Sequence, residues 1–191
     1  MNPEERRGRP WVKAILGVLC LLMATMWVYY FVTYFRHGKD PGVYQLADEN
    51  WRREATPICI AAQAERNTLE DTTGGLIKDP TVEQLLQRAT VVDKATDIVE
   101  HMLDEIVVIP VATARDDELL KIFEENYRII IGDRRRYTAA LRRGERVQYS
   151  ETIVAGGPVS NVVLDFTAGV KGNNVPECSP PGELGGDITT G

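Results

Sequence analysis

The chain has 191 residues, of which 22 are basic and 28 are acidic, so its net charge is −6. After position 35, 18 basic residues stand against 26 acidic ones, a net charge of −8. This acidic balance excludes the basic footprint that nucleic-acid binding requires, so no nucleic-acid partner is expected. The chain after position 35 is long enough for one domain with a modest core.

An apolar segment without charges extends from Ala14 to Phe35, between Lys13 and Arg36. As a helix rising about 1.5 Å per residue it would measure roughly 33 Å, slightly more than the ~30 Å hydrocarbon core of a bilayer. Aromatic residues, which favour the headgroup region, lie toward both of its edges: Trp11, Tyr29, Tyr30 and Tyr34. The sequence therefore predicts a retained transmembrane helix (a signal-anchor) over 14–35 in a single-pass membrane protein, with the lipid bilayer as its first partner.

A cleavable signal peptide is the alternative interpretation of this segment. The apolar run exceeds the ~7–15 residues of a typical signal, its C-terminal flank is bulky and aromatic, and no A-x-A-like site follows. These features favour retention of the helix.

Basic residues indicate the orientation of the predicted helix. Four precede the apolar segment within thirteen residues, whereas two follow it closely: Arg6, Arg7, Arg9 and Lys13 before, Arg36 and Lys39 after. The positive-inside rule then predicts that residues 1–13 form a cytoplasmic basic tail and that the large domain is extracytoplasmic, at the plasma membrane.

Cysteine usage supports the same location. Cys59 and Cys178 are the only cysteines outside the apolar segment, which itself contains Cys20. Distant cysteines of this kind pair in an oxidising compartment, so a Cys59–Cys178 disulfide is predicted. Two unpaired cysteines are the alternative.

Four helical segments are expected beyond the membrane. Residues 36–56 form a juxtamembrane linker or helix, and a first helix is expected to start at Thr56 and Pro57, with the threonine as N-cap. Strong three- and four-residue periodicity then predicts helices from about 81 to before Pro110 and from 113 or 116 to about 143. Residues 147–157 are interpreted as a loop, and a short fourth helix covers 158–170.

These elements predict an all-α fold: an antiparallel helical bundle of about four helices over 57–171, followed by an irregular Pro/Gly-rich tail over 172–191. In such a bundle the start of the first helix and the end of the fourth lie at one end. Cys59 and Cys178 would then meet at the base of the bundle.

The sequence contains little that indicates catalysis. His101 has Asp97, Asp104 and Glu105 at helical spacing, which could present a metal site. On a helix with many acids such neighbours also arise by chance, and no serine lies in a G-x-S-x-G elbow. No enzyme activity, metal or cofactor is expected.

Charge is distributed unevenly along the chain. Residues 79–125 are strongly acidic, whereas six arginines cluster between Gly132 and Arg146: Arg134, Arg135, Arg136, Arg142, Arg143 and Arg146. One interpretation is a solvated helix end whose arginines pair with acids on neighbouring helices. The other is a docking patch for an acidic partner or an anionic envelope polymer.

Several residues at the two ends of the exterior part also carry a resemblance: Trp51, Cys59, Ala61, Ala62, Glu65, Arg66, Leu69, Asp71, Val175–Pro181 and Leu184–Asp187. They resemble those of uncharacterised single-pass membrane proteins of actinobacteria. The resemblance implies a cell-envelope setting and carries no activity with it.

Together these observations predict a membrane-anchored extracytoplasmic interaction or accessory module that meets another membrane or envelope protein. The alternative is an exterior ligand-sensing domain. Because the expected cytoplasmic tail is short, such a sensor would signal through a partner membrane protein.

Overall fold

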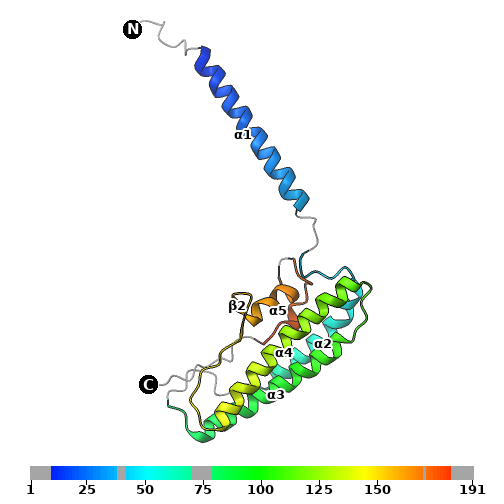
Figure 1. Ribbon diagram of the computed structural model, residues 1–191, viewed down its shortest axis with the longest axis vertical. Coiled ribbons are helices and arrows are strands. Elements are labelled where there is room, and N and C mark those ends of the chain that lie inside the picture. The colour runs from blue at the N-terminus through cyan, green and yellow to red at the C-terminus, as the bar shows by residue number, and fades with distance from the viewer. Residues whose placement is uncertain (1–9, 38–41, 70–78, 170, 182–191) are drawn as a thin grey trace. The chain divides into compact units, whose positions relative to one another are not determined.

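The computed structural model describes residues 10–37, 42–69, 79–169 and 171–181 (Figure 1). The chain divides into two compact units between Pro41 and Gly42. The first contains helix α1 (Pro10–His37), and the second is called the helical domain. Its elements are α2 (Glu49–Asn67), α3 (Val82–Val107), α4 (Ala114–Arg142), β1 (Ile153–Val154), β2 (Gly157–Pro158), α5 (Val159–Thr167) and the 3₁₀ turn η2 (Pro176–Cys178). The chain is mostly helical, as the all-α prediction requires.

Some sequence features lie outside the described residues. They are the basic residues of the N-terminal tail before Pro10, residues 38–41 of the expected juxtamembrane segment, residues 70–78 between the first two expected helices, and the C-terminal tail from 182.

Helix α1 is apolar around its whole circumference. Within the described part of the chain it is the one helix long and apolar enough to cross a membrane, over Trp11–Thr33, with a mean hydropathy of 2.1. None of that stretch is buried against the protein, so its leucines, valines and aromatic rings face outward. A helix that is apolar on every side needs an apolar environment on every side.

Helix α2 begins earlier than the sequence analysis expects. Asp48 is its N-cap, accepting a hydrogen bond from Asn50 N at 2.8 Å, and the helix continues through Pro57. The expected start at Thr56 and Pro57 is therefore wrong. Pro57 has no backbone N–H, so the carbonyl of Arg53 lacks its usual hydrogen bond within the helix. Both residues are exposed, so water can donate to that oxygen instead.

Helices α3 and α4 form as their sequence patterns predict. Thr81 and Gln84 make a reciprocal capping box at the start of α3. The Thr113 hydroxyl accepts from Asp116 N at 3.0 Å at the start of α4, which continues past Gly132 to Arg142. The two helices run antiparallel, because Asp104, late in α3, pairs with Arg128 in the middle of α4, whereas Asp93, earlier in α3, pairs with Arg142 at the end of α4.

The segment after α4 contains a small hairpin in place of the loop expected over 147–157. Strands β1 and β2 pair antiparallel through a two-residue turn at Ala155 and Gly156, both with positive φ. Helix α5 then covers only 159–167 of the expected 158–170. The chain turns sharply at Gly169, where a Cβ would lie 2.5 Å from the carbonyl oxygen of Asp165.

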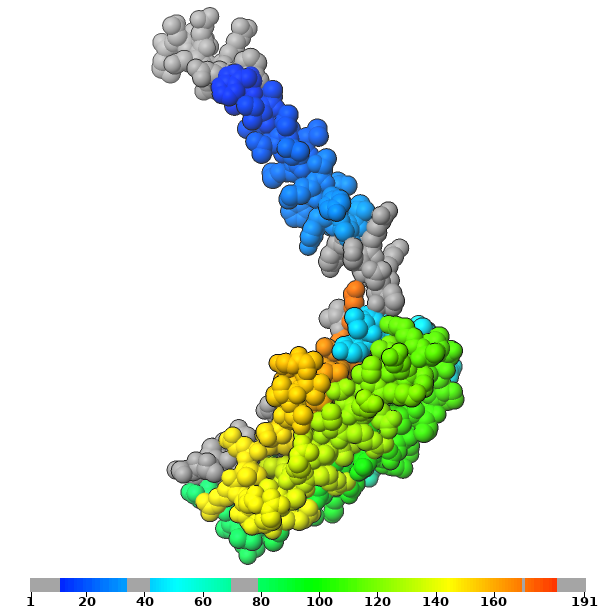
Figure 2. All heavy atoms as spheres, viewed as in Figure 1, coloured from blue at the N-terminus to red at the C-terminus, as the bar shows by residue number. Residues whose placement is uncertain are grey.

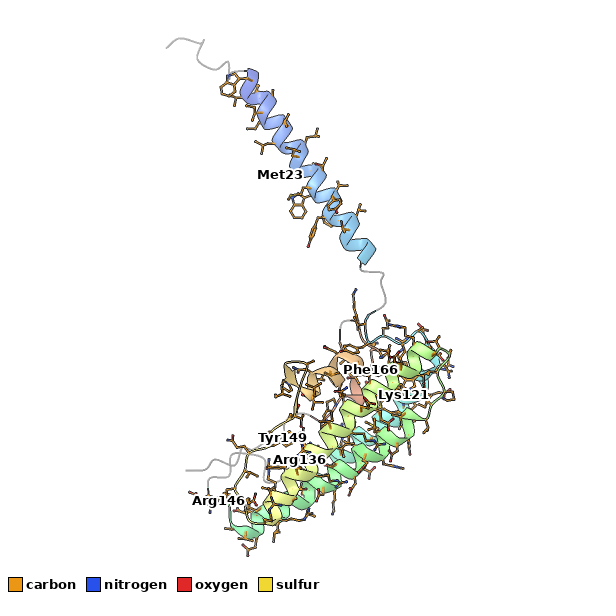
Figure 3. All side chains as sticks on the ribbon, viewed as in Figure 1. Met23, Lys121, Arg136, Arg146, Tyr149 and Phe166 are labelled. Atoms are coloured by element: carbon orange, nitrogen blue, oxygen red, sulfur yellow. A yellow bond between two sulfur atoms is a disulfide. The ribbon has the colours of Figure 1, made fainter. Side chains whose placement is uncertain are left out.

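The main core joins all four helices of the domain. Trp51 of α2, Phe123 of α4 and Phe166 of α5 pack as an aromatic cluster, with Phe123 and Phe166 stacked at 4.3 Å between ring centroids. The indole of Trp51 donates to the carbonyl of Ile106 of α3 at 2.9 Å. Phe166 lies at this end of the domain and Arg146 at the other (Figure 3). A smaller cluster lies toward the second end: Leu85, Ala89, Val92, Tyr137 and Leu141.

Cys59 and Cys178 form a disulfide that joins α2 to η2. The predicted pair is present, but its expected place at the start of the first helix is wrong. Because α2 begins at Glu49, Cys59 lies in the middle of this 19-residue helix, within the buried stripe that Trp51, Ala55 and Ala62 share. The bond fixes the C-terminal turn against the main core.

Candidate functional site

The arginine cluster of α4 does not form a single surface. Consecutive residues of an α-helix point about 100° apart, so Arg134, Arg135 and Arg136 face three different environments. Arg134 is buried against α3, Arg135 contacts the acidic face of α3, and Arg136 faces the segment after α4. The cluster that the sequence predicts as one docking patch is thus divided among three sides of the helix.

One side is a ladder of ion pairs between α3 and α4. Arg128, Arg135 and Arg142 recur every seven residues and meet the acidic side chains Asp93, Asp97, Glu100 and Asp104 of α3. Burial raises the pKa of Asp93, but hydrogen bonds from Thr138 and Arg142 outweigh it and hold the pKa below its usual value. Much of the opposite charge that the sequence concentrates in two separate regions is therefore paired within this ladder.

The last two arginines of the cluster lie at the end of α4 and in the segment after it. Arg143 pairs with Glu145 at 2.5 Å, and Arg146 pairs with Asp79, which precedes α3, at 3.0 Å. Both remain substantially exposed. The interpretation that these arginines pair with acids on neighbouring helices therefore describes Arg135 and Arg142. Arg136 and Arg143 pair instead with acids two or three residues away in the chain, and Arg146 pairs with an acid that precedes α3.

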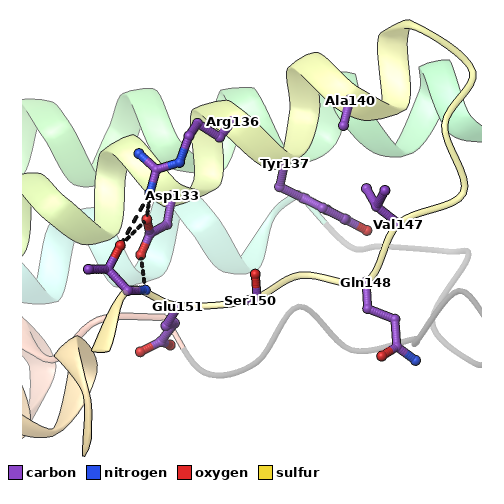
Figure 4. Close-up of a pocket in the computed structure, with 9 residues that line it drawn as sticks. Asp133, Arg136, Tyr137, Ala140, Val147, Gln148, Ser150 and Glu151 are labelled. Atoms are coloured by element: carbon purple, nitrogen blue, oxygen red, sulfur yellow. Dashed lines mark hydrogen bonds and ion pairs between the residues drawn. The ribbon is translucent and has the colours of Figure 1, made fainter. Parts of the chain in front are cut away.

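The third side of α4 carries a cleft of about 260 Å³ (Figure 4). Its floor is α4 and its other wall is the segment 147–152, which Figure 2 shows in yellow along the end of the yellow-green helix. The lining is Asp133, Arg136, Tyr137, Ala140, Val147, Gln148, Ser150, Glu151 and Thr152. Hydrogen-bonding groups from both walls face this space, so the cleft suits a polar ligand or a polar peptide segment.

Asp133 holds the two walls of the cleft together. Its carboxylate, with a 1% exposed side chain, accepts hydrogen bonds from the backbone N of Thr152 at 2.7 Å and from its hydroxyl at 2.8 Å. Arg136 pairs with the same carboxylate, yet its side chain is 67% exposed. Arg136 is therefore the member of the arginine cluster that presents a charge inside a concave surface.

Two tyrosines join α4 to the segment 147–152 beside the cleft, and one of them, Tyr137, lines it. The ring of Tyr149 packs edge-on against Tyr137 at 5.7 Å between centroids, which fixes the segment 147–152 on α4. The hydroxyl of Tyr137 accepts from the buried Nε of Arg88 at 2.8 Å. Burial and the neighbouring Glu151 raise the pKa of Tyr149 to about 12, so it remains a neutral donor at physiological pH.

Groups suited to metal binding are not assembled in the described part of the chain. No cluster of three or more His, Cys, Asp or Glu side chains is placed to hold an ion there. His101 contacts Glu105 at 3.0 Å on an exposed face of α3. Asp104 instead pairs with Arg128 of the ladder.

Sequence reasoning missed Asp133 and Thr152 as determinants of the cleft. It also missed the burial of Arg134, although the position of Arg134 in the apolar periodicity of α4 indicated it. Arg134 falls in the same helical stripe as the buried residues Tyr127, Ile130, Tyr137 and Leu141. A charged residue at a position of that stripe is expected to be buried with it.

Comparison with protein-family models, with curated proteins and with solved structures finds no match to this chain.

Proposed function

We propose that this protein is a single-pass, membrane-anchored module of the cell envelope whose helical domain lies outside the cytoplasm and binds a partner membrane or envelope protein without catalysis. The observation that carries the proposal is the combination of a fully outward-facing apolar helix with a disulfide-closed domain. An apolar helix of this length is stable in a lipid bilayer, and a disulfide forms and persists in an oxidising compartment.

The proposed orientation has the N-terminus in the cytoplasm. Support comes from the four basic residues before the apolar segment against two close behind it. In this proposal α2, α3, α4 and α5 act as the antiparallel helical bundle on the exterior side. A retained anchor also distinguishes the proposal from a secreted domain, in which α1 would be cleaved as a signal peptide.

The cleft of α4 is the surface that we assign to the partner. Arg135 is occupied by three carboxylates and Arg134 is buried, so neither offers a free charge to an incoming protein. Arg136 lines a concave surface and is largely exposed. A partner segment with an acidic residue and exposed backbone donors and acceptors complements this lining.

Topology is tested by adding protease to spheroplasts from cells that produce the full chain. The helical domain should be degraded while the membrane is intact, and α1 should remain with the membrane fraction. Survival of the domain until the membrane is breached would contradict the orientation. Recovery of the domain in the culture medium, without α1, would show a cleaved signal instead.

The partner surface is tested by a photo-crosslinking amino acid placed at Gln148, an exposed residue of the cleft. The matched control carries it at Glu118, which is exposed at the other end of α4. A protein crosslinked from position 148 and absent from position 118, and lost on Arg136→Gln in a salt-sensitive way, supports the proposal. Equal crosslinking from both positions would contradict it.

An exterior ligand-sensing domain that signals through a partner membrane protein is the second candidate. It is favoured by polar side-chain atoms of Arg66 and Tyr127, which are buried in the helical domain without a hydrogen-bond partner.

A further inference from the structure

Two buried polar atoms of the helical domain have no hydrogen-bond partner among the residues that the structure describes. They are the hydroxyl oxygen of Tyr127 on α4 and Nε of Arg66 in the last turn of α2. Tyr127 is fully buried. Buried hydroxyl and guanidinium groups are normally bonded, because an unpaired one costs about 1–3 kcal/mol. Two buried polar atoms without hydrogen bonds, on two different helices, therefore require an explanation.

Arg134 completes the group. It lies seven residues after Tyr127, two turns along the same face of α4, and long helical side chains lean toward the helix N-terminus, that is toward Tyr127. The arginine is 2% exposed, and its Nε donates to the hydroxyl of Thr96 at 2.9 Å. Thr96 in turn donates to the carbonyl of Val92 at 2.6 Å, so α3 holds the guanidinium in one orientation.

The two arginines share this region without a counter-charge. Among the described residues neither Arg66 nor Arg134 forms an ion pair with a carboxylate, unlike the arginines of the α3–α4 ladder. Burial lowers the pKa of each, and the like charge of Arg66 lowers that of Arg134 further. Arg134 is a buried cation and Arg66 a partly buried one close enough to interact with it, an arrangement that favours an anion beside them.

We propose that Arg66, Tyr127 and Arg134 form a binding site for a small oxyanion, a carboxylate or phosphate group. The planar guanidinium groups present paired N–H donors that match two oxygens, and the phenol adds a third donor. Arg66, at the end of α2, is the partly exposed member of the three, so in this proposal the ligand enters past it. This site goes beyond the proposed partner surface, whose lining does not include these three residues.

The site is tested with inorganic phosphate as the probe and full-length protein in detergent. Isothermal titration and thermal melting are measured with phosphate, sulfate or acetate replacing chloride at constant ionic strength. Phosphate should bind saturably and raise the melting temperature in step with its concentration. A shift equal to that of chloride would show general screening and would overturn the proposal.

Tyr127→Phe is the most specific variant, because it removes only an atom that has no hydrogen-bond partner in the described part of the chain. Without phosphate its stability should equal or exceed that of the wild type. With phosphate its affinity should fall roughly tenfold or more, since a hydrogen bond to a charged group is lost. Unchanged affinity in this variant would exclude the phenol from the site.

Arg134→Met should weaken phosphate binding more than Tyr127→Phe does, and Arg66→Met provides the same test at a half-exposed position if the first variant fails to fold. Arg53→Met, on the exposed face of α2, removes the same charge and is the control; its binding should be that of the wild type. Equal loss in all three arginine variants would show non-specific attraction. Acetate binding as tight as phosphate would assign the site to carboxylate ligands, and tighter phosphate binding to phosphorylated ones.

Discussion

In the half of the helical domain that contains α5 and η2, all four helices contribute to one apolar cluster around Trp51, Phe123 and Phe166, and a disulfide closes its edge. We call this the disulfide half. The opposite half, the arginine half, contains the smaller apolar cluster of five buried residues and the buried arginines Arg88 and Arg134. Polar contacts with threonine and tyrosine hydroxyls occupy its interior.

The difference between the halves separates stability from function. Apolar burial contributes about 25 cal/mol per Å² and does not depend on direction, so the disulfide half can stabilise the domain without being specific for a ligand. Buried arginines cost free energy unless they are paired. Arg134, which forms no ion pair among the described residues, is such a case in the arginine half, and departures from folding rules of this kind concentrate at functional sites.

The largest expected effect comes from opening the disulfide. Its cysteines are 119 residues apart, and closing such a loop stabilises a fold by up to about 5 kcal/mol on the chain-entropy model. Cys59→Ala with Cys178→Ala should therefore lower the melting temperature strongly, as measured by circular dichroism of full-length protein. Cys20→Ala, in α1, is the control and should leave the melting of the helical domain unchanged.

Core truncations on a single helix compare the halves directly. Phe123→Ala should cost about 3–5 kcal/mol, whereas Leu141→Ala should cost about 2–3 kcal/mol because its smaller cluster can relax. Urea unfolding followed by tryptophan fluorescence measures both. A larger loss of unfolding free energy for Leu141→Ala than for Phe123→Ala would contradict the conclusion that the disulfide half contributes more to stability.

Much of the fold follows from the sequence, for reasons visible in particular residues. The periodicity of α3 and the caps at Thr81 and Thr113 are local signals, and local signals determine where helices begin. Pro57 misled the analysis because proline suits the first turn of a helix as well as an exposed interior position. The buried stripe from Trp51 to Ala62 spans Pro57 and indicated the longer helix.

The site was harder to predict because it depends on register. The partners of Arg135 and Arg142 follow from how α3 and α4 align, which no single helix encodes. The cleft depends on Asp133 meeting Thr152 across 19 residues of chain. A run of arginines in the sequence indicated one patch, whereas helical geometry distributes it over three sides.

A smaller effect is expected from loosening the cleft. Asp133→Asn removes the charge that Arg136 and the backbone N of Thr152 share, so stability should fall by about 1–3 kcal/mol. Limited proteolysis should then cut the segment 147–152 sooner. Glu145→Gln, an exposed pair with Arg143, should change stability by less than about 0.5 kcal/mol. Equal protease resistance in both variants would contradict the role of Asp133.

The smallest effect concerns the ladder and its pH dependence. Because the folded-state pKa of Asp93 is lowered, its contribution is present above the unfolded value of about 3.9 and is lost as the pH falls through the folded value. Arg135→Gln should cost about 0.2–1 kcal/mol at pH 7, and this difference from the wild type should shrink in acid. Thermal melts at pH 7 and in acid measure it, and a difference that grows in acid would contradict the assignment.

Hydrogen exchange along α4 tests the contrast between the halves most directly, because this one helix spans both. Amides around Phe123 and Tyr127 should exchange only through global unfolding. Amides around Tyr137 and Leu141 should exchange through a partial opening of lower free energy. Uniform protection from Phe123 to Leu141, or stronger protection at the Leu141 end, would contradict the account.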